Sequence, residues 1–156
     1  MRRSLYSAAS VFAIVAAACA VEQKAPAASG KSIAEAYVHA WNGHDLTALD
    51  TILAPDAVHE DFAQNVHAKG IPAIKDFMRQ VIASEPDLSW RMTNTIEDGR
   101  FVALEWTWTS TYTGPDPTGK TVTQKKVSGR GASFIEIENG KIKRFTDYYD
   151  LASFFR

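Results

Sequence analysis

Cysteine is nearly absent from this chain, because Cys19 is the single one among 156 residues. One thiol cannot form an intramolecular disulfide, so the fold has to be held together by its core. A charge excess is also lacking, since 17 Lys and Arg stand against 18 Asp and Glu. The chain has no basic excess, which would indicate a nucleic-acid partner. It also has no acidic block, which would indicate a solvating tail. The hydrophobic share of 46% is typical of a packed chain, and the length fits one domain.

Motifs that hold metals, phosphates or activated nucleophiles are missing as well. His59, Asp61 and His67 are close in sequence, but their spacing matches no known zinc motif and no cysteine accompanies them. No Gly-rich phosphate loop and no Ser/His/Asp or Cys/His arrangement stands out. We therefore expect no metal and no cofactor, so any chemistry has to come from acid–base side chains.

The first 20 residues are interpreted as an export signal. Arg2 and Arg3 form a short basic start, and the run 5–18 that follows carries no charge. This run is too short for a permanent membrane span and is typical of a secretory signal. It ends in Ala16-Ala17-Ala18-Cys19, which resembles the lipobox of bacterial lipoproteins. In those proteins the signal is cut before the cysteine, which then carries the lipid.

Ordinary signal cleavage after Ala20 is the alternative, with Ala18 and Ala20 as the small flanking residues. Residues 21–31 are rich in Ala, Pro, Ser and Gly and predict a flexible tether, which leaves 32–156 as the globular domain. The sequence thus predicts a protein of the bacterial cell envelope, either lipid-anchored or periplasmic or secreted. A lipid anchor on Cys19 is the single membrane contact that we expect.

Apolar residues recur at helical spacing in three segments before residue 87. Ser32 and Glu35 form a capping box that starts the first helix. Asp45 caps the second helix, and 70–72, the sequence Gly-Ile-Pro, opens the third. A short strand is expected over 57–62. The three helices are expected to end at Asn42-Gly43, Pro55 and Pro86.

From Leu88 onward the apolar period changes to two, which predicts strands joined by tight turns such as Asp98-Gly99 and Asn139-Gly140. Gly129 and Gly131 are the expected bend points of a long strand. Helices followed by a strand meander predict an α+β fold with a curved antiparallel sheet and three N-terminal helices packed on it. The predicted strands are 88–96, 101–113, 121–138 and 141–149, followed by a short helix over 151–155 that Asp150 can cap.

The order of these elements over residues 32–156 resembles the nuclear transport factor 2-like superfamily, in particular its SnoaL-like polyketide cyclase and ketosteroid isomerase branches. That resemblance implies a cone-shaped sheet around a ligand pocket and, frequently, homodimers formed by the exposed sheet face. It does not imply one reaction, because this fold hosts enzymes, binding proteins and interaction modules. The stretches that carry it are Tyr37-Val38 to Trp41-Asn42, His44-Asp45-Leu46, Leu53 to Val58, Gly70 to Phe77, and Gly140 to Asp150.

Asp147 is the first catalytic residue that the resemblance implies. In SnoaL-like cyclases an Asp at the matching place in the last strand is the general acid/base of an intramolecular aldol closure. Strand alternation puts Asp147 on a face with Phe145 and Tyr149, where a poorly solvated carboxyl group keeps its proton more readily, but also with Lys143. Tyr112 stands where those cyclases carry a His, and tyrosine is a poor base near neutral pH.

The resemblance to ketosteroid isomerases implies two further candidates, Asp61 as the base and Tyr37 as the oxyanion-hole donor. The second acid donor of those isomerases has no counterpart here, because Ala132-Ser133 stands in its place. Tyr37 also fits a core aromatic on an amphipathic helix, and Asp61 also fits a carboxylate at the edge of a loop.

Two functions remain open at this point. The first is proton transfer beside a carbonyl group, as in cyclases or isomerases, carried out by Asp147 or Asp61 without a metal. The second is a non-catalytic envelope module that binds a ligand or assembles with other proteins. Both readings expect a small apolar molecule in a pocket with aromatic walls. The substrate-binding residues that we expect are His59, Trp41, Trp106, Trp108, Tyr112 and Tyr149.

The first testable prediction is that Cys19 is lipidated. The substitution Cys19→Ser should release the protein into the soluble envelope fraction or leave its signal uncut, because the lipid is the expected anchor. Membrane fractionation with mass spectrometry of the mature N-terminus measures both outcomes. A wild-type protein that is soluble and begins at Val21 would show that ordinary cleavage takes place instead.

Overall fold

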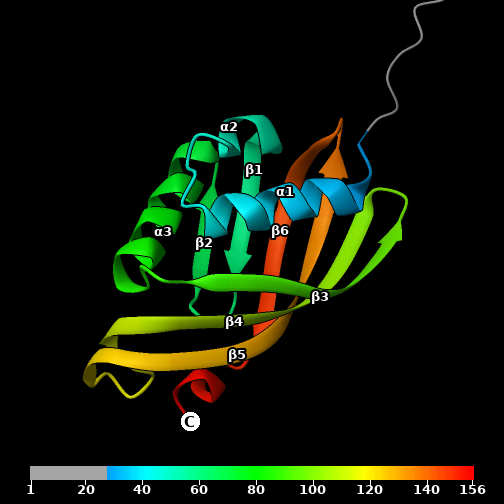
Figure 1. Cartoon of the computed structure of the whole chain (residues 1–156). Coiled ribbons are helices and arrows are strands. Elements are labelled where there is room, and N and C mark those ends of the chain that lie inside the picture. Colours follow the sequence, from blue (N-terminus) through cyan, green and yellow to red (C-terminus); the bar gives the residue numbers. More distant parts are fainter. Residues whose placement is uncertain (1–27) are drawn as a thin grey trace, which may run out of the picture.

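A computed structural model describes residues 28–156, so the predicted signal, Cys19 and most of the tether lie outside the described residues. The fold is α+β, as predicted, with a strongly curved six-stranded sheet and helices against its inner face (Figure 1). Within the described part of the chain, no helix is both long and apolar enough to cross a membrane. The helices are α1 (Gly30–Asn42), α2 (Leu49–Ile52), α3 (Ile71–Ser84) and the short 3₁₀ helix η1 (Leu151–Phe155).

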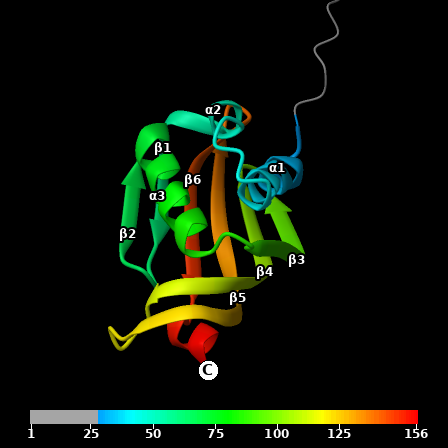
Figure 2. The same ribbon diagram turned by 60° about the vertical axis from the view of Figure 1, so that its left-hand side comes forward.

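The sheet has the strand order β2-β1-β6-β5-β4-β3. Strands β3 to β6 form the predicted antiparallel meander, whereas β1 pairs with β6 in parallel. The expectation of a wholly antiparallel sheet was therefore wrong at this one junction. The long strands curl at one end, where η1 packs beside β5 (Figure 2). The strands are β1 (Leu53–Asp61), β2 (Val66–Lys69), β3 (Ser89–Asp98), β4 (Phe101–Pro115), β5 (Thr121–Glu138) and β6 (Lys141–Tyr149).

Helix α1 begins two residues before the predicted capping box and inside the predicted tether. Ser29 is its N-cap, and the Ser29 side chain accepts a hydrogen bond from the Ser32 amide at 3.1 Å. The Glu97 carboxylate of β3 accepts two more, from the amides of Gly30 at 2.7 Å and Lys31 at 3.1 Å. A carboxylate at a helix N-terminus is also favoured by the helix dipole, so a distant acid fixes this start.

The segment after α1 differs most from the sequence prediction. Asp45 does not cap a long helix, because its carboxylate closes a turn by accepting from the amides of Thr47 and Ala48. Helix α2 consequently has only four residues, and β1 begins already at Leu53. Pro55 lies inside β1, at an irregularity in the pairing with β6, where its missing N–H costs no ladder hydrogen bond. The short edge strand β2 was not predicted.

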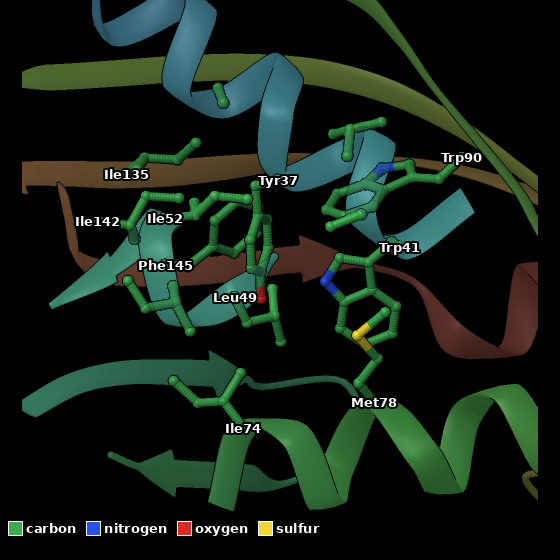
Figure 3. Close-up of a cluster of buried hydrophobic side chains, with 14 of the residues drawn as sticks. Tyr37, Trp41, Leu49, Ile52, Ile74, Met78, Trp90, Ile135, Ile142 and Phe145 are labelled. Atoms are coloured by element: carbon green, nitrogen blue, oxygen red, sulfur yellow. The ribbon is translucent and has the colours of Figure 1, made fainter. Parts of the chain in front are cut away.

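The core lies between the helices and the concave face of the sheet. Tyr37 stands at its centre between α1 and the strands, and Met78 of α3 approaches Trp41 of α1 (Figure 3). Trp41 and Trp90 meet edge to face, with ring centroids 6.0 Å apart. The predicted apolar stripe of α3 is confirmed, with Ile82 half-buried and the other four residues buried, namely Ile74, Phe77, Met78 and Val81.

Two glycines of β5 leave space for aromatic rings. A Cβ atom added at Gly131 would lie 2.5 Å from the Trp106 ring, and one at Gly129 would collide with the Phe154 ring. Any larger residue would push these rings away from the sheet. The glycines that the sequence marked as bend points therefore also set how closely the two rings approach β5.

Truncation of either Phe77 or Trp106 to Ala should lower the free energy of unfolding by about 3–5 kcal/mol, because each leaves a cavity among buried side chains. Urea unfolding followed by circular dichroism measures the loss. Phe101→Ala is the matched control, since the Phe101 side chain is exposed and should cost far less. Unfolding curves that coincide for all three variants and the wild type would contradict the assigned faces.

Candidate active site

The curved sheet, α3 and η1 enclose a cavity of about 340 Å³. This volume suits a small molecule, and aromatic side chains are the largest group on the wall. The six side chains expected to contact a ligand all lie on this wall: His59, Trp41, Trp106, Trp108, Tyr112 and Tyr149. Phe77, Trp90 and Phe154 add further rings.

Asp147 reaches the cavity from β6 and is buried. Its Oδ1 accepts a hydrogen bond from the Ser133 hydroxyl, and the Ser133 oxygen in turn accepts from the Trp106 indole N–H at 2.8 Å. Its Oδ2 lies 3.2 Å from Nε2 of His59. Asp147 is therefore fixed through a hydrogen bond on one oxygen, while its other oxygen lies beside the His59 ring.

Strict strand alternation would place Lys143 on the same face as Asp147. In the structure it does not, because the alternation breaks before Asp147. The pairing of β6 with β5 shifts register between Glu136 and Ile137, so Ile142 and Phe145 are both buried although three positions separate them. Lys143 turns outward and forms an ion pair with Asp56. The β-bulge thus brings Asp147 into the cavity without a neighbouring ammonium group.

His59 of β1 connects Asp147 with the core. Its Nδ1 shares a hydrogen bond of 2.9 Å with the Tyr37 hydroxyl, and its ring stacks on Phe145 at a centroid distance of 5.4 Å. Its Nε2 is near Asp147 but outside hydrogen-bond geometry, so this buried nitrogen has no hydrogen-bond partner within residues 28–156. A buried polar atom without a partner is rare, and here it belongs to a residue of the cavity wall.

Tyr37 lies behind His59 and does not line the cavity. Its side chain is fully buried, and this burial raises the pKa of its hydroxyl far above the usual range. Tyr37 therefore stays protonated, and it can influence a ligand only through His59. Direct donation from Tyr37 to a ligand, the role that the isomerase resemblance implies, does not fit this placement.

Asp61 faces the same cavity from β1, directly beside Asp147. The two residues are register partners on the parallel strands β1 and β6. Asp61 accepts hydrogen bonds from the Gln64 amide at 2.9 Å, the Gln64 side chain at 3.0 Å and the Tyr149 hydroxyl at 2.8 Å. Burial nevertheless raises the pKa of Asp61, and the charge of Asp147 adds to this shift. Asp61 therefore keeps its proton more readily than an isolated carboxyl group does.

Sequence reasoning missed Gln64, Glu85 and the role of Ser133. Gln64 lies three residues after Asp61, a spacing at which an Asp commonly accepts from the backbone of its own turn. Ser133 was noted only as the place of a missing acid, because its bond to Asp147 depends on the register between β5 and β6. Glu85 follows α3 and carries no sequence signal that separates it from a surface glutamate.

Two other predicted features lie away from this chemistry. The Tyr112 hydroxyl donates to the Pro115 carbonyl at 2.8 Å. The imidazole group on the cavity wall is that of His59, on another strand than Tyr112. His67 pairs with Glu60 at 3.2 Å and does not line the cavity. Among residues 28–156, no group of three or more His, Cys, Asp or Glu side chains is placed to hold a metal.

Many solved structures share this fold. A protein of ketosteroid isomerase-like fold from Catenulispora acidiphila, solved with trimethylamine, is 22% identical over 81% of this chain and 91% of its own, with a TM-score of 0.69. A candidate polyketide cyclase from Pseudomonas putida is 25% identical over 81% and 95%, with a TM-score of 0.67. IdmH, a candidate polyketide cyclase from Streptomyces antibioticus, is 16% identical over 80% and 94%, with a TM-score of 0.69.

No curated protein matches the chain. The family model of the SnoaL-like domain matches residues 34–145, from within α1 to the middle of β6. This match includes Tyr37, His59 and Asp61, and it ends two residues before Asp147. On this match and the shared fold, the chain belongs to the SnoaL-like domain family.

Proposed function

We propose that this domain binds a small, largely apolar carbonyl compound in its cavity and transfers a proton at the carbon beside the carbonyl group. The observation that carries the proposal is the pair of carboxyl groups, Asp61 and Asp147, at partner positions on neighbouring strands and on one aromatic cavity wall. Enzymes that move protons at neutral pH need an acid and a base whose environments differ. The cyclase and isomerase character of similar folds supports the same class of reaction.

Asp147 is the base in this proposal. One of its oxygens is held by Ser133, and the other lies beside His59, so the carboxylate has a fixed position on the wall. As the carboxylate takes a proton from the ligand carbon, the C–H electron pair moves to the carbonyl oxygen and forms an enolate. A carboxylate in a fixed position is suited to accept this proton as a general base.

The enolate oxygen requires a hydrogen-bond donor. Asp61 supplies one when it is protonated, which its raised pKa favours. His59 offers a second through Nε2 when Nδ1 accepts from the Tyr37 hydroxyl. Return of the proton from Asp147 to another carbon completes an isomerisation. Attack of the enolate carbon on a second carbonyl group completes a cyclisation, and the new alkoxide then takes the proton.

We also propose that the domain works outside the cytoplasmic membrane, as the charge-free run and Cys19 predict. We further propose that it forms a homodimer through the outer face of its sheet, which no helix of residues 28–156 covers (Figure 2). Three large side chains are exposed there, Phe62, Phe134 and Tyr148, and the rings of Phe62 and Tyr148 lie 5.5 Å apart. An apolar patch of this kind supports a self-complementary contact between two copies.

The dimer proposal predicts that Phe134→Glu converts the protein to a monomer, because two like charges would then face an apolar partner surface. Sedimentation velocity of the wild type and the variant measures the change. A wild type that sediments as a monomer at all concentrations would overturn this proposal.

The catalytic proposal predicts that Asp147→Asn lowers proton transfer by about two to four orders of magnitude, the usual worth of a general base. The probe is 2-tetralone in deuterated buffer, and NMR measures the exchange of its hydrogens beside the carbonyl group. Ligand affinity, followed by fluorescence of the cavity tryptophans, should change little, because Asn keeps the shape of Asp147.

Two further variants make the result specific. Asp61→Asn should cause a smaller loss of exchange, because Asp61 assists the enolate oxygen and is not the base. Asp98→Asn, on an exposed position of β3, is the control for loss of one negative charge and should leave exchange unchanged. If only Asp61→Asn lost the exchange of 2-tetralone hydrogens, Asp61 and not Asp147 would be the base. Wild-type binding without any exchange would instead favour the non-catalytic ligand-binding module.

A further inference from the structure

Glu85 is a third acid of the cavity, and the proton-transfer step does not use it. It follows the last residue of α3 and is half-buried on the cavity wall. Its Oε2 accepts two hydrogen bonds from β4, one from the Trp108 indole N–H at 2.6 Å and one from the Ser110 hydroxyl. Its Oε1 accepts none from residues 28–156. The carboxyl group is therefore fixed through one oxygen while the other is free to bind a ligand.

The charge of the cavity wall is one-sided. Four acids line it, namely Asp61, Glu85, Asp116 and Asp147, and among the described residues no Lys or Arg does. The Lys125 ammonium group lies over the ring of Phe155, which lines the cavity. It donates a hydrogen bond to the Phe155 carbonyl at 2.5 Å. Acidic side chains on low-dielectric walls raise the local concentration of cations and repel anions. The cavity thus favours a ligand with a positive group.

Glu85 and Asp147 lie at separate places along one aromatic wall. The Trp106 indole bonds to Ser133, the partner of Asp147, whereas the Trp108 indole bonds to Glu85. Trp106 and Trp108 are two residues apart on the same face of β4, which corresponds to about 7 Å along the strand. A ligand on the order of 10 Å long that lies along these two rings can therefore reach both acids.

We propose that Glu85 and Trp108 form a subsite for a protonated amine. The ammonium group donates a hydrogen bond to Oε1 of Glu85 and lies against the Trp108 indole, which combines a charge-assisted bond with a cation–π contact. The assignment of a substrate class rests on the proposed function. If the cavity transfers a proton beside a carbonyl group and also binds an ammonium group, its substrates are carbonyl compounds that carry a basic amine. Burial raises the pKa of Glu85, and a neighbouring ammonium would lower it again.

The test compares 3-phenylpropylamine with 3-phenylpropan-1-ol, which differ in the ammonium and hydroxyl groups and have nearly the same shape. Isothermal titration calorimetry of the full mature protein gives both dissociation constants. We expect the amine to bind at least about tenfold more tightly than the alcohol. Glu85→Gln should reduce this ratio to near one and leave alcohol binding unchanged, because Gln can still accept from Trp108 and Ser110.

Glu105→Gln is the matched control, because it removes one glutamate charge from an exposed position of β4 that does not line the cavity. It should keep the full preference for the amine. A preference that survives in Glu85→Gln would show that Asp61 and Asp147 attract the amine, and it would overturn the subsite. The same holds if the wild type binds no amine at about 10 mM.

The outcome is separable from that of the proposed function. Asp147→Asn should lose 2-tetralone exchange but keep the amine preference, since Glu85 is intact. If exchange depends on Asp147 while Glu85→Gln leaves the preference unchanged, the subsite is wrong and the proton transfer stands. If the wild type catalyses no exchange while Glu85→Gln abolishes the preference, the cavity is an amine-binding site and the proton-transfer proposal fails.

Discussion

The parallel pairing of β1 with β6 is the contact on which the site depends. These strands are remote in sequence, and their register places Asp61 beside Asp147 and His59 beside Phe145. A shift of β1 by one residue would turn Asp61 and His59 to the opposite face, because strand side chains alternate. The antiparallel meander fixes β6, and the packing of α2 and α3 fixes β1, so the carboxyl pair is a product of the whole fold.

A row of buried polar groups crosses this junction. It runs from the Trp106 indole through Ser133 and Asp147 to His59 and Tyr37, and it joins β4, β5, β6, β1 and α1. Buried polar groups are stable only when they are bonded, so each member restricts the position of the next. The weakest contact in the row is that of His59 Nε2 with Asp147, because it lacks hydrogen-bond geometry. The row therefore leaves its one unpaired nitrogen on the cavity wall, where chemistry is proposed.

The sequence predicted what local patterns determine. The bounds of β5 and β6, the apolar stripe of α3 and the 3₁₀ helix after Asp150 agree with the structure, because periodicity and caps act over a few residues. The parallel neighbour of β6, the four-residue strand β2 and the bulge that turns Lys143 away could not be predicted, since they depend on contacts between distant segments. The sequence named Asp147 but could not predict its partners Ser133 and His59, because these contacts also join different strands.

Stability alone does not account for the composition of this wall. Placing two adjacent carboxyl groups and an unpaired imidazole nitrogen in a buried position opposes folding, and apolar residues of similar size would pack there without that cost. The surrounding structure nevertheless holds these groups in place, through Ser133 on one acid and through Gln64 and Tyr149 on the other. Glu85 is held by the same means at the other end of the Trp106–Trp108 wall. Rigid support of costly polar groups around one cavity is the arrangement expected where a ligand, rather than the fold, uses them.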